Sequence, residues 1–349
     1  MKYRPIGSSG MQASTIILGT WATGGFQWGG TDAQESIRAI HAAMDEGINT
    51  IDTAPVYGFG ESEIRVGKAV KGRRDRVLLA TKCGVVWHIE KGQFFFSADD
   101  HGPTQDGSGR KVYRYLHPQS IRYEIEQSLH RLSTDYIDLY QVHWMDDTTP
   151  IPEIMNVLLE LKKEGKIRAI GVSNATVEHL EQYRAEDVID SDQERYSLFD
   201  REIEKKNIRY CTNHAMSFIA YSPLFHGLLT GRMTGKTRFG QGDIRSTRLR
   251  FAPDYIEKVN QMLLRLDPIV ASHQTTTTRL VLAYMLRQPG CTHVVVGARK
   301  VAHACENAKA ADVDLSAEQI HTMNQIFSDY LPRLSTETTA VKNKDPSVA

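Results

Sequence analysis

Short apolar runs and longer amphipathic runs alternate along almost the whole chain. The first cycle sets the pattern: residues 14–18 form an apolar run, a helical pattern covers 32–46, Gly47 ends it, and residues 48–51 form the next apolar run. A glycine directly after the last helical residue is a common helix stop. Alternating strands and helices favour a parallel sheet covered by helices over an all-α or all-β fold.

Further apolar runs predict six more strands. They cover residues 77–81, 136–140, 167–170, 188–191, 218–221 and 294–296, with helical patterns at 61–71, 118–132 and 152–164. Eight strand and helix units in one chain of 349 residues suggest a closed barrel. An open doubly wound sheet would need a glycine-rich phosphate turn after its first strand, and that turn is absent. We therefore predict an α/β fold of the (β/α)8 TIM barrel type.

Three segments depart from this rhythm. Residues 2–12 predict a hairpin that closes the bottom of the barrel. Long insertions at 87–116 and 225–251 follow the third and seventh strands, at the C-terminal face where barrel enzymes build their sites, so we expect both to contact substrate. The first is rich in aromatic residues, which predicts a lid over the pocket. We expect a single barrel domain over residues 1–334 and a loosely ordered polar tail at 335–349.

The composition narrows the classes of function. Forty-two basic and 42 acidic side chains balance, and no basic block stands out, so the chain has no electrostatic footprint for nucleic acid or an anionic membrane. The four cysteines are scattered without a C-x-x-C pair, which fits neither a disulfide framework nor a zinc site. No apolar run is long enough to span a bilayer. We expect a cytoplasmic protein with reduced thiols.

Polar side chains close three consecutive predicted strands. Asp52 ends the second strand and Tyr57 follows five residues later, Lys82 ends the third strand, and His143 ends the fourth. Taken singly, they have ordinary explanations as a turn cap, a half-buried aromatic, a rim lysine and a core histidine. In a barrel these strand ends meet at one mouth, so their coincidence indicates an active site.

Acid–base chemistry gives this set a use. A phenol has a reference pKa of about 10 and donates protons poorly near neutral pH unless a nearby ammonium stabilises the phenolate. Lys82 can supply that charge, and Asp52 can hold Lys82 in place. The four residues therefore predict proton transfer by Tyr57.

The motifs around these residues resemble those of the aldo-keto reductase family from about Tyr3 to about Ala310. They are, in the expected order, Gly19-Thr20-Trp21, Ile51-Asp52-Thr53-Ala54 followed by Tyr57-Gly58, Ala80-Thr81-Lys82, Tyr136 to His143, and Ile170 to Asn174. Two later motifs, Gly227 to Gly231 and Gly297 to Lys300, are most similar to the bacterial branch of stress-related and sugar-related reductases. The resemblance implies reduction of an aldehyde to an alcohol with hydride from a nicotinamide.

The resemblance also implies roles for individual residues. Tyr57 would be the general acid, Lys82 with Asp52 would lower its pKa, and His143 would orient the carbonyl oxygen. The implied cofactor contacts are Gly19, Thr20, Trp21, Ser173, Asn174, Gln193, Tyr221, Ser222, Leu224, Gly227, Arg232, Gly297, Arg299, His303, Glu306 and Asn307. No metal is implied.

The choice of dinucleotide rests on the segment after the last strand. Gly297 to Arg299 opens a predicted helix, and a helix N-terminus with a nearby arginine suits an adenosine 2′-phosphate. By resemblance Glu306 and Asn307 contact the adenine and Arg232 lies along the pyrophosphate, so we predict NADPH. His303 stands where relatives often carry Gln or Arg, which leaves NADH as the weaker alternative.

The substrate is a small carbonyl compound on this interpretation. Three tryptophans, Trp21, Trp87 and Trp144, would line an apolar mouth. Three basic residues of the first insertion, Arg110, Lys111 and Arg114, suit a phosphate, carboxylate or sulfonate, although a solvated loop face explains them as well. Sugar-derived and anionic aldehydes are therefore the candidate substrates.

Two other classes of function compete with a reductase. A metal-dependent barrel hydrolase would use Asp52 and His143 as ligands, but the thirteen histidines include no H-x-H pair and Lys82 would repel a cation. A non-enzymatic NADPH-binding, redox-sensing subunit would keep the same residues, so the sequence leaves it open. No coiled-coil heptad is present, and the sequence predicts no oligomeric state.

Overall fold

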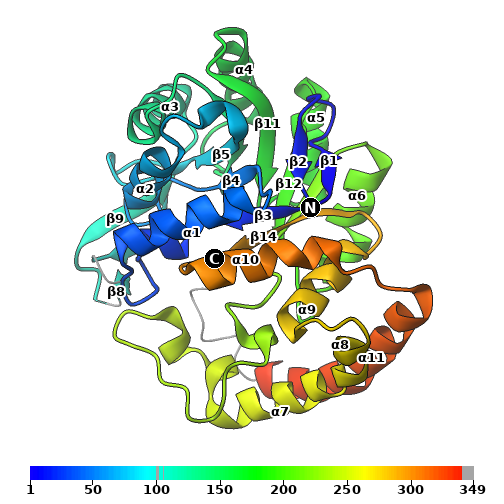
Figure 1. Ribbon diagram of the computed structural model, residues 1–349. Helices are drawn as coiled ribbons and strands as arrows, with labels where there is room; N and C mark the ends of the chain where they lie inside the picture. The colour runs from blue at the N-terminus through cyan, green and yellow to red at the C-terminus, as the bar shows by residue number, and fades with distance from the viewer. Residues whose placement is uncertain (100–101, 105, 340–349) are drawn as a thin grey trace.

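The computed structural model describes residues 1–99, 102–104 and 106–339, and its centre is a closed barrel of parallel strands (Figure 1). The strands are β3 (Ile16–Gly19), β4 (Thr50–Asp52), β5 (Leu78–Cys83), β10 (Ile137–Val142), β11 (Ile167–Ser173), β12 (Ser191–Arg195), β13 (Ser217–Tyr221) and β14 (Cys291–Gly297). Each strand pairs with the next barrel strand along the chain, and β14 pairs with β3 to close the ring. The α/β fold and the (β/α)8 barrel predicted from the sequence are confirmed.

Helices cover the outside of the barrel (Figure 1). Around the ring lie α1 (Ala33–Asp45), α2 (Glu61–Val70), α3 (Pro118–Leu132), α4 (Ile151–Lys163), α5 (Val177–Glu186), α6 (Asn207–Asn213), α9 (Thr277–Leu286) and α10 (Val301–Ala308). Helix α4 shows why they pack there, because Ile154, Leu158 and Leu161 recur at helical spacing and are buried. The remaining helices are α7 (Pro253–Leu264), α8 (Asp267–Ser272) and α11 (Ala317–Thr339), with short 3-10 helices at Ala22–Gly24, Arg74–Arg76, Glu202–Lys205, Leu228–Thr230, Ile244–Thr247, Leu249–Phe251 and Lys309–Asp312.

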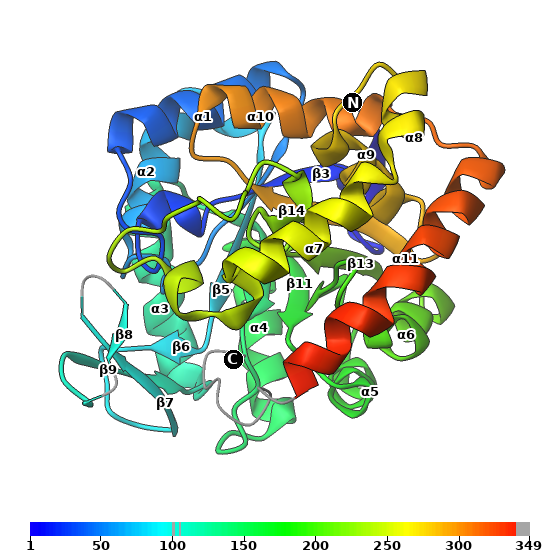
Figure 2. The same cartoon turned by 90° about the horizontal axis from the view of Figure 1, so that it is seen from below.

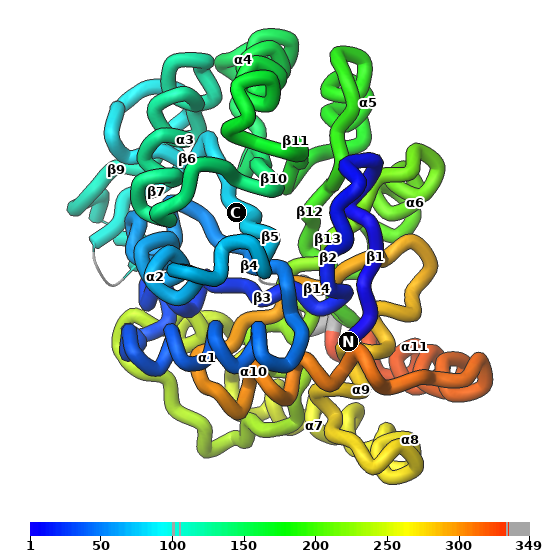
Figure 3. The backbone as a smooth tube through the Cα atoms, turned by 45° about the horizontal axis from the view of Figure 1, so that its top comes forward, coloured from blue at the N-terminus to red at the C-terminus, as the bar shows by residue number. Residues whose placement is uncertain are grey.

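The N-terminal hairpin closes one end of the barrel, as predicted. Strands β1 (Tyr3–Pro5) and β2 (Gln12–Ser14) pair antiparallel, and Figure 3 shows them near β12, β13 and β14. The backbone N–H of Gly7 donates to Ser217 Oγ at 2.9 Å. Ile6 and Ala13 are buried against the apolar residues inside the barrel. The opposite end, at the C-terminal ends of the strands, is therefore the one that stays accessible.

The first insertion folds as a small antiparallel sheet. Its strands are β6 (Val85–Val86), β7 (Gln93–Ala98), β8 (Pro103–Thr104) and β9 (Arg110–Arg114), in the spatial order β6, β9, β7, β8. The sheet stands at one edge of the barrel (Figure 2). Val85 and Val112 are buried between it and the barrel, so the insertion is a packed element with its own core.

Three predicted boundaries are wrong. The sixth strand, expected at 188–191, runs from Ser191 to Arg195. Its residues are polar, so the sequence shows no apolar run there, but most of them are buried in the folded protein. The helix expected to open at Gly297 begins at Val301. Helix α11 continues to Thr339, so the expected end of the barrel domain at residue 334 falls inside a helix.

Residues 340–349 of the expected tail lie outside the described residues. The four cysteines are free, in line with the expected reduced thiols. Among the helices that the structure describes, none is both long and apolar enough to cross a membrane.

Candidate active site

The site is formed by the second of two successive layers of side chains inside the barrel. Ile17, Ala80, Leu139, Ala169, Ile219 and Val295 form an apolar layer with the hairpin residues at the closed end. Because side chains alternate across a strand, the residues two positions later face the same side. They are Gly19, Lys82, Gln141, Gly171, Tyr221 and Gly297, and they form the next layer toward the C-terminal mouth. This layer is where polar groups replace apolar ones.

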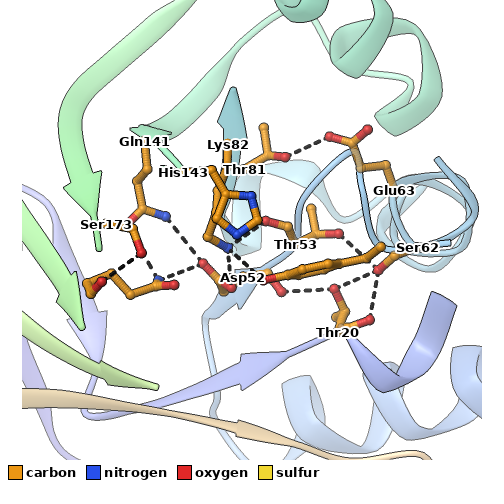
Figure 4. Close-up of polar contacts among 12 residues, drawn as sticks. Thr20, Asp52, Thr53, Ser62, Glu63, Thr81, Lys82, Gln141, His143 and Ser173 are labelled. Atoms are coloured by element: carbon orange, nitrogen blue, oxygen red, sulfur yellow. Dashed lines mark hydrogen bonds and ion pairs between the residues drawn. The ribbon is translucent and has the colours of Figure 1, made fainter. Parts of the chain in front are cut away.

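A buried ion pair occupies the centre of this polar layer. Lys82 Nζ donates to Asp52 Oδ1 at 2.7 Å, to the carbonyl oxygen of Thr53 at 2.9 Å and to the Tyr57 hydroxyl at 3.4 Å (Figure 4). The Lys82 side chain is completely buried and that of Asp52 nearly so. A buried ammonium is tolerated only when it is paired and hydrogen-bonded, and this one has three oxygen partners.

Two glutamine side chains complete the surroundings of Asp52. Gln193 Nε2 donates to Asp52 Oδ2 at 2.8 Å, and Gln141 Nε2 approaches the same oxygen at 3.3 Å (Figure 4). Both oxygens of Asp52 therefore have protein partners, which leaves this carboxylate poorly suited to hold a metal ion. In the described ranges of the chain, no group of three or more His, Cys, Asp or Glu side chains lies where it could hold one.

Tyr57 and His143 stand over the ion pair, with their rings 5.8 Å apart and nearly perpendicular. Burial works to lower the pKa of Lys82, but the charge of Asp52 and the contact with Tyr57 outweigh it, so the net direction is upward and the ammonium stays charged. Burial, and then the Lys82 charge, hold the pKa of His143 well below its usual value. The imidazole is therefore neutral at neutral pH.

The expected direction of the Tyr57 shift is wrong. Burial raises the pKa of Tyr57, and the Lys82 ammonium only partly offsets this because the Asp52 carboxylate works against it. The phenol therefore keeps its proton throughout the neutral range. At this distance the Lys82 ammonium is able to stabilise a phenolate formed when the proton leaves.

The first turn of α2 ties three of these strands together from outside the barrel (Figure 4). Ser62 Oγ lies 2.8 Å from Thr20 Oγ1 and 2.9 Å from Thr53 Oγ1. The next residue, Glu63, accepts the Thr81 hydroxyl at 2.6 Å and pairs with Arg131 at 2.7 Å. Thr81 directly precedes Lys82, so these bonds fix the ends of β3, β4 and β5 relative to one another.

A large cavity of about 1250 Å³ opens at this mouth. It contacts Asp52, Tyr57 and His143, and every residue predicted to contact the cofactor lines it. Within the wall, Asn174 Nδ2 donates to the His143 carbonyl oxygen at 2.9 Å, and the Tyr221 hydroxyl donates to Asn174 Oδ1 at 2.8 Å. The predicted carboxamide contacts and the acid–base residues thus belong to one hydrogen-bonded wall.

The mouth near Tyr57 is aromatic. Trp21 and Trp144 line it, together with Phe94, Phe95 and Phe96 of the first insertion. The predicted lid therefore does reach the cavity, through β7.

The other substrate contacts expected from this insertion are not among the described residues that line the cavity. The missing ones are Trp87, Arg110, Lys111 and Arg114. Trp87 packs edge-on against Phe59, Arg110 stacks over the same ring, Lys111 pairs with Glu90 at 2.8 Å, and Arg114 stacks over Phe95. Trp87 and Arg110 therefore pack on Phe59, outside the insertion, while Lys111 and Arg114 bind residues within it.

The positive charge in the cavity wall comes instead from other segments. Besides the expected Arg232 and Arg299, the wall contains Arg195, Arg238, Arg245, Arg248 and Arg250, four of them from the second insertion. Sequence reasoning missed them because arginines in an irregular loop look like solvated surface. The density of arginine between residues 238 and 250 was the available signal.

Comparison with known proteins identifies the class. Residues 15–327 match the Aldo/keto reductase family. The chain therefore belongs to this family of oxidoreductases and, in its general class, is an NAD(P)H-dependent carbonyl reductase. The resemblance seen in the motifs is confirmed.

Individual relatives cover almost the whole chain. The chain is 39% identical to the NADH-specific methylglyoxal reductase of Escherichia coli (strain K12), over 93% of this chain and 98% of that protein. Among solved structures, the glycerol dehydrogenase AKR11B4 from Gluconobacter oxydans is 35% identical, with a TM-score of 0.82 over 95% and 96% of the two chains. An aldo-keto reductase from Klebsiella pneumoniae in complex with NADPH is 27% identical, with a TM-score of 0.68 over 95% and 96%.

Proposed function

We propose that this protein reduces small aldehydes to alcohols with NADPH, and that Tyr57 donates the proton. The observation that carries the proposal is the contact of Lys82 Nζ with both Asp52 and the Tyr57 hydroxyl, at the end of a cavity with an arginine-rich wall. When bound, the nicotinamide supplies a hydride, which no protein side chain can donate.

The protein's own groups handle the carbonyl oxygen. Neutral His143 offers a ring N–H that orients this oxygen beside the Tyr57 hydroxyl. Tyr57 donates its proton to the oxygen as negative charge develops there. The Lys82 ammonium then stabilises the phenolate, while Asp52 keeps Lys82 in place.

The residues present fit a dinucleotide with an additional phosphate. Ser173 and Asn174, supported by Gln193, would hold the carboxamide, and Tyr221 would stack on the nicotinamide. Arg232 and Arg299 belong to the part of the same wall that lies beside α10. Arginine is well suited to phosphate because its guanidinium binds two oxygens at once. The Klebsiella relative with NADPH supports this choice, whereas the NADH-specific relative keeps NADH as the weaker alternative.

We infer that the substrate is a small neutral aldehyde, with sugar-derived aldehydes as the leading group. The aromatic mouth formed by Trp21, Trp144 and Phe95 offers apolar surface, and the cations expected from the first insertion lie away from it. The relatives named for methylglyoxal and glycerol support small oxygenated compounds. On this proposal the arginines of the cavity wall serve the phosphates of the dinucleotide, so anionic aldehydes are disfavoured.

A matched panel of aldehydes tests the proposal. Methylglyoxal and glyceraldehyde would be compared with glyoxylate and succinic semialdehyde, each with NADPH and with NADH. We expect steady turnover of the neutral pair with NADPH and much lower kcat/KM for the anionic pair. Tight NADPH retention with negligible turnover of every aldehyde would instead support a non-enzymatic redox-sensing subunit.

A substitution at Arg299 tests the preference for NADPH over NADH. Arg299→Gln removes a guanidinium from the cavity wall and should raise KM for NADPH severalfold while leaving KM for NADH nearly unchanged. An equal rise for both dinucleotides would contradict the assignment of Arg299 to the 2′-phosphate.

A further inference from the structure

The residue expected to receive the nicotinamide carboxamide has an unfavourable backbone conformation. Asn174 has a φ of +56°, in the left-handed region that non-glycine residues seldom adopt. Its side chain is held by the wall, since Nδ2 donates to the His143 carbonyl oxygen and to Ser173 Oγ while Oδ1 accepts from Tyr221, which leaves Oδ1 one further lone pair. A non-glycine residue in this conformation costs about 1–3 kcal/mol unless its surroundings hold it there.

The surroundings hold it through the next residue, Ala175. The backbone N–H of Ala175 donates to Glu194 Oε1 at 2.7 Å. The carbonyl oxygen of Ala175 accepts from Asn207 Nδ2 at 2.8 Å, and Asn207 Nδ2 also donates to Asp192 Oδ2 at 2.8 Å. Asp192 and Asn207 are almost inaccessible, and Glu194 reaches the cavity. Three buried side chains of β12 and α6 therefore fix the peptide groups on both sides of Ala175.

Two carboxyl groups, those of Asp192 and Glu194, belong to this cluster. Asp192 and Glu194 stand two residues apart on β12, so they project from the same face of the strand. Asp192 Oδ1 has no donor among the described residues, and neither carboxyl group forms an ion pair with a lysine or arginine of the described chain. A buried carboxyl group with no opposite charge beside it keeps its proton more readily than one in water.

The environment favours retention of such a proton. Burial raises the pKa of both carboxyl groups, and for Glu194 the charge of Asp192 adds to the effect. The Arg195 guanidinium, on the next residue, is engaged with Asp200 at 3.2 Å. Cys211 approaches Asp192 Oδ2 as a thiol at 3.9 Å, and its own pKa is raised by burial, so it brings no opposing charge.

We propose that Asp192, Glu194 and Asn207 act as positioning residues that hold Asn174 in the conformation that receives the nicotinamide carboxamide. This rests on the proposed function, because it assumes that the dinucleotide binds along Asn174. The acceptor atom on Glu194 matters on this account, and its negative charge does not.

Two substitutions at one position separate the acceptor from the charge. Glu194→Gln keeps an oxygen for the Ala175 N–H and removes the charge, so the dissociation constant for NADPH should stay within twofold of the natural protein. Glu194→Leu keeps the volume but leaves the Ala175 N–H without a partner, and NADPH should bind about tenfold more weakly, equivalent to about 1.4 kcal/mol. Binding is read from the fluorescence of NADPH without substrate.

A variant elsewhere controls for general loss of stability. Glu124 is also a buried carboxyl that accepts a backbone N–H, from Gly84 at 2.9 Å, but it lies outside the barrel on α3. Glu124→Leu should lower Tm comparably and leave NADPH affinity unchanged. Should Glu194→Leu fail to fold, Asn207→Ala removes the donor on the other side of Ala175 and should weaken NADPH binding in the same way.

The outcomes are distinct. Folded Glu194→Leu or Asn207→Ala with natural NADPH affinity would overturn the positioning role. A loss in Glu194→Gln as large as that in Glu194→Leu would contradict the claim that the acceptor atom of Glu194 matters and its negative charge does not. If the natural protein binds no dinucleotide at all, the proposed function fails first, and that result is visible before any variant is measured.

Discussion

At the scale of single residues, the site depends on a lysine that has no contact with water. Several kcal/mol are needed to bury an ammonium, and here three oxygens and the charge of Asp52 compensate for that cost. The result is a positive charge held 3.4 Å from the Tyr57 hydroxyl, already in place when proton transfer begins.

Removal of the Lys82 charge should therefore have two effects that can be measured separately, one on folding stability and one on turnover. Lys82→Met leaves Asp52 as an uncompensated buried carboxylate, so we expect a loss of about 3–5 kcal/mol in the free energy of unfolding together with loss of turnover. Adding Asp52→Asn removes the orphaned charge, and the double variant should recover most of the stability but none of the activity. Denaturant unfolding and NADPH consumption measure the two effects. A double variant no more stable than Lys82→Met would contradict this account of the pair.

At the scale of secondary-structure elements, the sequence predicted most of the barrel strands and the polar residues that end them. The apolar runs located most of the barrel strands, and the polar residue at the end of each run located Asp52, Lys82 and His143. Strand β12 was misplaced because its sequence from Ser191 to Arg195 is polar, and only the folded structure supplies partners such as Asn207. Asp192 and Glu194 escaped notice for the same reason.

The sequence predicted where the two insertions lie but not how they fold. The aromatic content of 87–116 indicated a cover over the pocket, yet whether its cations faced the cavity depended on pairing within a sheet that no local pattern specifies. The second insertion shows a similar dependence on distant partners. Ile244 N–H donates to the Gln27 carbonyl oxygen at 2.9 Å, and Asp243 forms a bridge with Trp28, more than two hundred residues earlier in the chain.

These contacts join two loops over the cavity, and they should retard cofactor release. Asp243 is buried, pairs with Arg245 at 2.6 Å and accepts the Arg245 backbone N–H at 3.0 Å. Asp243→Ala removes both bonds, so the rate constant for NADPH release should rise roughly tenfold, about 1.4 kcal/mol, while hydride transfer within the bound complex stays unchanged. Stopped-flow fluorescence measures release and single-turnover absorbance measures transfer. An unchanged release rate would show that the two loops do not restrain the cofactor.

At the scale of the whole molecule, one buried acid links stability to pH. Burial raises the pKa of Glu124 to about 8, from an ordinary value of 4.5, between the barrel and α3. Between these two values the folded protein holds a proton that the unfolded chain releases. The free energy of unfolding should therefore fall as the pH rises from about 4.5 to about 8, and then level off, by at most about 5 kcal/mol.

Glu124→Gln should make this fall smaller, because the amide does not titrate and still accepts the Gly84 N–H, while Asp192 and Glu194, whose pKa values burial also raises, account for the rest. We expect the variant to be close to the natural protein in stability near pH 5 and more stable near pH 9. Urea unfolding over that pH range provides the measurement. Parallel pH profiles for the two proteins would show that Glu124 ionises normally in the folded state.

The central claim is that Tyr57 donates the proton in a carbonyl reduction, and one variant tests it most directly. Tyr57→Phe keeps the ring beside His143 and removes only the hydroxyl. In a single-turnover mixture of enzyme, NADPH and methylglyoxal, the account predicts that NADPH still binds with nearly natural affinity and that its absorbance at the nicotinamide band does not decay. Decay at a rate near that of the natural protein would contradict it.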